Sequence, residues 1–264
     1  MEDWIKIPLN IFESYVDSFT GLTPLQAHNF TIKKNHSLRV AENTCCLARH
    51  LNLEEEGERV VVLSGIFHDI GRFNQLMEYN TFNDRESFDH ADHAITVLKE
   101  EKLLNRWNSR IQQLVYKAIQ FHNKLKIPSN LTPEEILYAR ILRDADKIDI
   151  LKVLTDYYTD KSQPPNHTLT WDLPEARKVS EGVSKEILSG RLVSKKHVGS
   201  DVDVKIMQLS WIYDIHFRYS LEMILKNRFL EKIYDSLPKN DETIEIYRKV
   251  KVYAENKLME SCNK

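Results

Sequence analysis

The stretch GIFHDIGR, residues 65–72, places a histidine and an aspartate side by side directly after an apolar run. An imidazole nitrogen and a carboxylate oxygen are both good ligands for divalent metal ions. A lone histidine in an apolar helix is more often a core residue, so His68 and Asp69 indicate a metal site only if other ligands accompany them. A metal ion held by such ligands would activate a water molecule for hydrolysis.

Further histidines and aspartates lie on both sides of this pair. In chain order they are His36 in KNHSLRV, His90 and His93 in SFDHADHAITVL, His122 in AIQFHNK, and Asp144 and Asp146 in ILRDADKIDIL. Each lies on or at the end of a predicted helix, among apolar residues that we expect to face the core. Helical bundles build metal sites from such inward-facing side chains. The set suits divalent first-row metals, namely Fe, Mn, Co, Ni or Zn, with Mg as a further possibility.

The elements that must position these residues are all predicted to be helices. Glycine is scarce, with 7 in 264 residues, and apolar residues recur at helical rather than alternating spacing. Thr132 and Pro133 form a good helix start, from which a helix can run past Asp146 toward Tyr158. The other predicted helices are 35–51, 54–68, 90–102, 106–122, 175–189, 203–235 and 241–260. We therefore expect an all-α protein.

The proline-containing segment 160–174 reads as a loop that separates two parts of the chain. We expect a core at residues 1–160, which carries the metal site, and a C-terminal helical extension at residues 161–264 that packs on this core. The alternative is that both parts form one single domain.

Charge and residue composition indicate which kinds of binding partner and which cell compartment to expect. The formal net charge of −2 provides no field that favours nucleic acid or an anionic membrane surface. Three cysteines, Cys45, Cys46 and Cys262, do not form a disulfide framework and indicate a reducing compartment. The apolar runs are too short for a membrane helix. We expect a cytoplasmic protein without a membrane segment, and nothing in the charge balance indicates nucleic acid as a partner.

The order H…HD…H…H…D, with GIFHDIGR after one helix and LRDADKID on another, closely resembles the HD-domain superfamily of metal-dependent phosphohydrolases. The resemblance covers about residues 28–155 and implies an all-α HD-domain helical bundle. Members with two additional histidines between the HD pair and the last aspartate usually hold a binuclear centre, in which the HD aspartate, here Asp69, bridges both metals. The implied ligands are His36, His68, Asp69 and Asp146 for one metal, with His90 and His122 for a second.

The resemblance also suggests residues that contact substrate. Arg72, directly after HD-x-G, and Lys147, directly after the DAD aspartate, are the expected phosphate-binding cations. His93 lies three residues after His90 and is a candidate for contact with the substrate or for support of a ligand.

Helix geometry separates the neighbouring aspartates of the DAD segment. Residues two apart on a helix diverge by about 200°, so Asp144 and Asp146 cannot both face one metal. The resemblance selects Asp146. Asp149 lies three residues further on, on the same helix face, where it can orient a metal ligand.

The expected function is hydrolysis of a phosphoester of a small molecule, with a nucleotide as the favoured substrate, by metal-activated water. Two alternatives stay open: a di-iron oxygenase of the same superfamily, as in inositol oxygenase, and a nucleotide-binding regulatory module without turnover. The residues NKLKIPSN after His122 contain no GYP-type signature, which weakens hydrolysis of cyclic dinucleotides.

Overall fold

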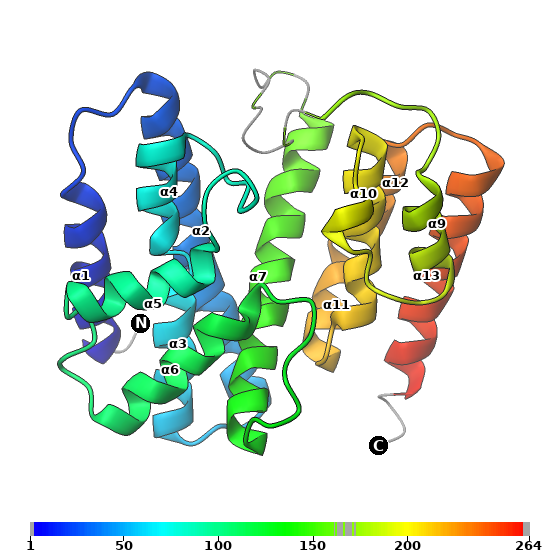
Figure 1. Ribbon diagram of the computed structural model, residues 1–264. Helices are drawn as coiled ribbons and strands as arrows, with labels where there is room; N and C mark the ends of the chain where they lie inside the picture. The colour runs from blue at the N-terminus through cyan, green and yellow to red at the C-terminus, as the bar shows by residue number, and fades with distance from the viewer. Residues whose placement is uncertain (1–2, 161, 163–165, 167–170, 172, 261–264) are drawn as a thin grey trace. The chain divides into compact units, whose positions relative to one another are not determined.

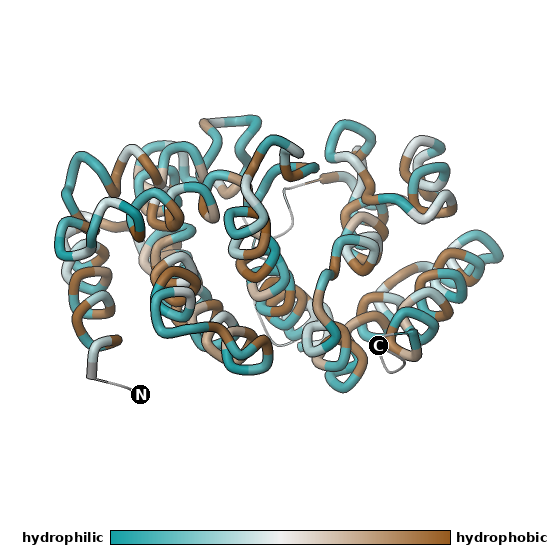
Figure 2. The backbone as a smooth tube through the Cα atoms, turned by 90° about the horizontal axis from the view of Figure 1, so that it is seen from below, coloured by the Kyte–Doolittle hydropathy of each residue, from teal (hydrophilic) through white to brown (hydrophobic). Residues whose placement is uncertain are grey.

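The computed structural model describes residues 3–160, 162, 166, 171 and 173–260, and the regular structure of these residues is helical (Figure 1). The predicted all-α fold is confirmed. The chain divides into two compact units, residues 1–149 and 150–264, and the division falls inside a long helix. The expected bounds of core and extension, 1–160 and 161–264, stay predictions. Apolar and polar residues alternate around the helices, as expected when each unit buries its own core (Figure 2).

The first unit is built from helices that pack mainly against their neighbours in the chain, with α3 and α6 as a more distant pair. The helix α2 (Pro24–His50) lies along α3 (Glu55–Phe67), α3 packs against α6 (Ser109–His122), and α5 (His90–Glu100) contacts both α4 (Gly71–Tyr79) and α6. Phe12, Phe67 and Phe73 are fully buried, and Phe12 makes edge-on ring contacts with the other two. The elements are η1 (Asp3–Ile5), α1 (Lys6–Asp17), α2 (Pro24–His50), α3 (Glu55–Phe67), α4 (Gly71–Tyr79), α5 (His90–Glu100), α6 (Ser109–His122) and the first part of α7 (Pro133–Thr159).

Local capping signals set where two site-bearing helices begin. Thr132 accepts a hydrogen bond from the Glu135 N–H, and the Glu135 carboxylate accepts one from the Thr132 N–H, so the predicted start of α7 is confirmed. Thr23 and Gln26 form the same reciprocal cap at the start of α2. With Pro24 in its first position, α2 begins well before residue 35, where the apolar spacing predicted it.

The two glycines of the GIFHDIGR stretch allow close helix packing. A Cβ atom on Gly65 would lie 2.8 Å from the Ala41 Cα atom in α2, and a Cβ atom on Gly71 would lie 2.7 Å from the His90 carbonyl oxygen in α5. Side-chain carbons do not approach backbone this closely, so only glycine fits at these two crossings. The histidine–aspartate pair lies between them, in the helical turn that joins α3 to α4.

The second unit differs from the sequence prediction. The helix expected over 241–260 is confirmed, whereas the continuous helix expected over 203–235 is wrong. In its place the chain forms several short helices joined by turns. The elements are the end of α7, α9 (Glu181–Leu188), η2 (Lys195–His197), α10 (Asp201–Ser210), η3 (Trp211–Asp214), α11 (Arg218–Lys226), α12 (Phe229–Asp235) and α13 (Asp241–Glu260).

The breaks have local causes. The backbone is extended at Ile215 and Phe217 and left-handed at Arg228, whose φ is 56°. The segment WIYDIHF consists largely of β-branched and aromatic residues with low helix propensity, and the turn at Ile215 buries its side chain. The helix predicted over 175–189 begins only at Glu181, because the buried Asp203 carboxylate accepts hydrogen bonds from the N–H and hydroxyl of Ser180 in an extended conformation.

Most of the predicted loop at 160–174 lies outside the described residues, as does Cys262. Among the residues that the structure describes, none of the helices combines the length and the apolar character needed to cross a membrane.

Candidate metal centre

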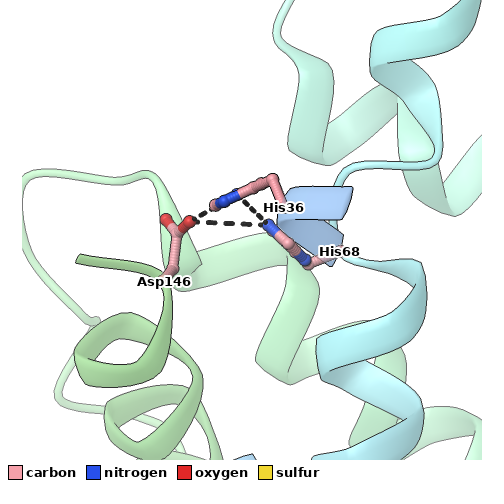
Figure 3. A group of neighbouring side chains, drawn as sticks. All are labelled: His36, His68 and Asp146. Atoms are coloured by element: carbon pink, nitrogen blue, oxygen red, sulfur yellow. Dashed lines mark hydrogen bonds and ion pairs between the residues drawn. The ribbon is translucent and has the colours of Figure 1, made fainter. Parts of the chain in front are cut away.

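Three of the predicted ligands meet in the first unit although they are far apart in the sequence. His36 from α2, His68 from the end of α3 and Asp146 from α7 point toward one another (Figure 3). The two Nε2 atoms are 3.2 Å apart, and the Asp146 Oδ1 atom lies 3.1 Å from the His36 Nε2 atom and 3.5 Å from that of His68. All three side chains are buried, and together they form one group that can hold a metal ion.

The two additional histidines form a second group beside the first. The Nε2 atoms of His90, at the start of α5, and His122, at the end of α6, are 3.1 Å apart, and both side chains are buried. His68, Asp69 and His122 likewise offer ligand atoms close enough to share a metal ion. All six residues predicted as ligands therefore converge on one region.

Asp69 lies between the two groups. Its Oδ2 atom is 3.5 Å from the Nε2 atoms of both His36 and His68, and its Oδ1 atom is 3.5 Å from the His90 Nε2 atom. One carboxylate oxygen thus faces each group, which is the arrangement that a carboxylate bridging two metals requires.

In each of the four imidazole rings the Nε2 atom faces the cluster and the Nδ1 atom faces away from it. Each Nδ1 atom faces an acceptor at 2.7 to 2.9 Å: Asp149 Oδ2 for His36, the Gly65 carbonyl for His68, Asp84 for His90 and the Ile119 carbonyl for His122. An Nδ1 atom in that position carries the ring proton, which leaves the Nε2 lone pair directed into the cluster. Two Nε2 atoms 3.1–3.2 Å apart need a positive charge between them, which either a proton or a bound metal cation can supply.

The charges of the cluster also favour a cation. Burial lowers the pKa of His68, but the carboxylates of Asp69 and Asp146 outweigh it and raise that pKa to about 10. Burial and the neighbouring rings of His90 and His68 lower the pKa of His122 to about 3. Burial would raise the pKa of both aspartates, yet adjacent cationic groups and imidazoles hold it well below the usual range. The buried donor set of imidazole nitrogens and ionised carboxylates therefore fits divalent first-row metals.

Asp149 contacts one of the predicted metal ligands, as helix geometry predicted. Its Oδ2 atom accepts a hydrogen bond from the His36 Nδ1 atom at 2.7 Å. Arg39 binds both oxygens of the same carboxylate, at 2.6 and 2.9 Å. Asp149 is thus held on two sides, and it fixes the orientation of the His36 ring.

Arg72, expected as a phosphate-binding cation, is held by the protein. Its Nη1 atom donates to the Gln75 side chain at 2.5 Å, to the Phe82 carbonyl at 2.7 Å and to the Asp84 carboxylate at 2.7 Å. Its Nε atom lies 3.6 Å from the Asp69 Oδ1 atom. The side chain is 10 % exposed, so Arg72 supports the centre from within the protein, and its contact with substrate stays a prediction.

The other two residues expected to contact the substrate are His93 and Lys147. The His93 ring packs on Phe88, with centroids 4.2 Å apart, and within the described residues it makes no hydrogen bond or ion pair with the six predicted ligands. Lys147 follows Asp146 in α7 and is 9 % exposed. Their roles in substrate binding stay predictions.

Three residues around the centre were not anticipated. Lys33 and Arg39 lie one helical turn before and after His36 on α2, and this spacing is a signal that the sequence analysis could have used. Asp84 lies in the loop between α4 and α5, where no periodic pattern marks it. It binds His90 Nδ1 at 2.8 Å as well as Arg72, so it joins two residues of the site.

A third group of possible ligands, Asp84, Asp89 and His90, does not make a separate metal site. The Asp84 carboxylate is paired with Arg72. The Asp89 carboxylate caps α5 through the Ala91 and Asp92 N–H groups and binds Lys124 at 2.6 Å. The carboxylates of Asp84 and Asp89 thus already bind other groups of the protein.

Comparison with curated proteins gave no match, and comparison with solved structures gave none. A family model of the HD domain matches residues 34–151, a range that includes all six predicted ligands and the aspartate that supports His36. The resemblance of this part of the chain to the HD domain is thereby confirmed.

Proposed function

We propose that this chain is a binuclear metal-dependent phosphohydrolase that cleaves a phosphoester of a small molecule, with a nucleotide as the favoured substrate class. One observation carries the proposal: Asp69 presents one oxygen to the His36–His68–Asp146 group and the other to the His90–His122 group. Such a centre has two adjacent cation positions, as two-metal hydrolysis of phosphate esters requires.

The residues of the proposed centre have separate roles in metal binding and in orienting the ligands. His36, His68 and Asp146 would hold one metal, His90 and His122 the other, with Asp69 shared between the two. The ions, when bound, would supply a nucleophilic water of lowered pKa and polarise the phosphoryl oxygens. Asp149 and Asp84 keep the imidazole Nε2 atoms aimed at the centre, while the packed helices exclude bulk water from it.

The formal charge of the site supports an anionic substrate. With the imidazoles neutral, as they must be when they bind metal, four carboxylates and three basic side chains give a charge of −1, and two divalent ions would turn it to +3. A dianionic phosphate group together with a hydroxide would neutralise that excess. The groups counted are Asp69, Asp84, Asp146 and Asp149 against Lys33, Arg39 and Arg72.

A substrate screen tests this function. The protein, reconstituted separately with Mn²⁺, Fe²⁺, Co²⁺, Ni²⁺, Zn²⁺ or Mg²⁺, is incubated with nucleotides, other phosphomonoesters and phosphodiesters, with and without O₂. We expect phosphate release or the corresponding mass change with at least one metal, independent of O₂. Turnover that requires iron and O₂ would instead support the oxygenase alternative, and nucleotide binding without turnover would support the regulatory module.

One variant of the proposed centre and one control variant test whether the activity in the screen depends on Asp69. Asp69→Asn should lower the rate at least roughly a hundredfold, because one ligand to both metals is weakened. Asp156→Asn is the matched control, since Asp156 is an exposed helix aspartate paired with Lys152, and its rate should equal that of the wild type. Activity that survives in Asp69→Asn would contradict the assignment of this centre.

A further inference from the structure

Lys33 contacts the carboxylate that lies between the two metal-binding groups. Its Nζ atom donates to the Asp69 Oδ2 atom at 2.6 Å, and its side chain is only 12 % exposed. The ammonium lies 5.1 Å from the centre of the Phe82 ring, which shields one side of it. Lys33 therefore places a positive charge at the centre itself rather than at the protein surface.

Lys33 and Arg72 flank Asp69 in different ways. Arg72 is fixed by Gln75, Asp84 and the Phe82 carbonyl, so its guanidinium has no freedom to follow a substrate. Within the described residues, Lys33 has Asp69 as its one hydrogen-bond and ion-pair partner. An ammonium has three donors on a flexible stem, so Lys33 can exchange this partner for another.

Metal binding would reduce the negative charge that the Asp69 carboxylate presents to Lys33. The Oδ2 atom that Lys33 binds is the oxygen that faces His36 and His68, and the Oδ1 atom faces His90. Ions in both groups would be held by Asp69 as well, and they would share its negative charge. The Lys33 ammonium would then have less counter-charge beside it, and an anion at that place would relieve the repulsion between the cations.

We propose that Lys33 is a phosphate-binding residue of this site, which binds Asp69 in the metal-free protein and a phosphoryl oxygen of the substrate in the metal-loaded protein. The inference rests on the proposed function for its substrate class. It assigns to Lys33 the contact that the sequence pattern suggested for Arg72.

Binding of inorganic phosphate to the Mn²⁺-loaded protein tests this assignment. By isothermal titration calorimetry, Lys33→Met should weaken phosphate binding by roughly ten- to hundredfold, the range for loss of one charge-assisted hydrogen bond. Lys34→Met is the matched control, because Lys34 pairs with Glu13 and Asp17 instead, and its affinity should equal that of the wild type. Lys33→Gln, which keeps a donor without the charge, should also lose affinity and serves if Lys33→Met does not fold.

A second measurement separates this role from a purely structural one. In the metal-free state Lys33→Met should lower the melting temperature by several degrees, because it removes the closest positive charge beside the buried Asp69 carboxylate. In the Mn²⁺-loaded state this difference should shrink, since the ions replace the lost positive charge. An equal loss of melting temperature in both states, together with unchanged phosphate affinity, would show that Lys33 only supports the fold.

The outcomes distinguish this inference from the proposed function. Unchanged phosphate affinity in a Lys33→Met protein with full metal content overturns the inference, even if the wild type hydrolyses phosphoesters. A metal-loaded wild type that binds no phosphate also overturns it. A wild type that binds phosphate through Lys33 but hydrolyses no phosphoester supports the inference and refutes the proposed function.

Discussion

Each histidine of the centre is held by its Nδ1 atom, and the nature of the acceptor differs. Two acceptors are backbone carbonyls one turn earlier in the chain, at Gly65 and Ile119, whereas the other two are carboxylates, Asp149 and Asp84. A carbonyl orients the ring, while a carboxylate also raises its basicity as a ligand. The two proposed metal positions therefore each depend on one supporting aspartate.

Asp84→Asn tests this dependence at the second position. The variant should weaken binding of one metal by roughly ten- to hundredfold, because His90 loses its charged partner, and should leave the other metal in place. Equilibrium dialysis with elemental analysis measures both stoichiometry and affinity. Glu86→Gln is the control, as Glu86 is an exposed acid in the same loop. Loss of both metals, or of neither, would argue against the assignment of Asp84 to His90.

At the scale of elements, the centre depends on how closely the helices approach. Gly71 begins α4 directly against the backbone of α5, so the position of His90 is coupled to that of the histidine–aspartate turn. Gly65 does the same for α3 and α2. The glycines of the GIFHDIGR stretch are thus part of the geometry of the site, although neither has a side chain that could bind a ligand.

Gly71→Ala should destabilise the first unit by roughly 1–3 kcal/mol, because the added Cβ meets backbone atoms that have little room to move. The same shift of α5 should reduce metal bound at His90. Chemical denaturation and metal analysis measure the two effects. Gly199→Ala is the control, since its Cβ would meet nothing closer than 3.9 Å. A Gly71→Ala protein with wild-type stability would show that α4 and α5 can separate without cost.

At the scale of the whole molecule, the proposed centre connects most of the first unit. Its ligands come from α2, the α3–α4 turn, α5, α6 and α7, and they span residues 36 to 146. All of them precede the division between the two units after residue 149. A cation bound there would tie five segments together in the folded state alone.

Removal of metal should therefore lower stability. Treatment with EDTA should reduce the melting temperature, followed by circular dichroism at 222 nm, by roughly 5–10 °C, as expected when a ligand present at about a hundred times its dissociation constant is removed. Addition of Mn²⁺ should restore it. A melting temperature that does not respond to either treatment would contradict a metal centre that joins these helices.

Much of the first unit was predictable because its signals are local. Thr132 and Pro133 mark the start of α7, apolar spacing marks α3, α5 and α6, and the HD pair stands out by residue type. The second unit was less predictable, since the breaks at Ile215 and Arg228 carry no proline or glycine and depend on which side chains the fold buries.

The sequence by itself determined the helical class, the family motif and the set of possible ligands, since residue types and helical spacing are properties of short segments. Only the tertiary structure decided that Asp69 stands between two groups, that Asp84 supports His90, and that Lys33 binds Asp69 while Arg72 is held by Asp84. These are contacts across 6 to 36 positions of the chain, and they depend on loop course and helix crossing, which periodicity does not encode.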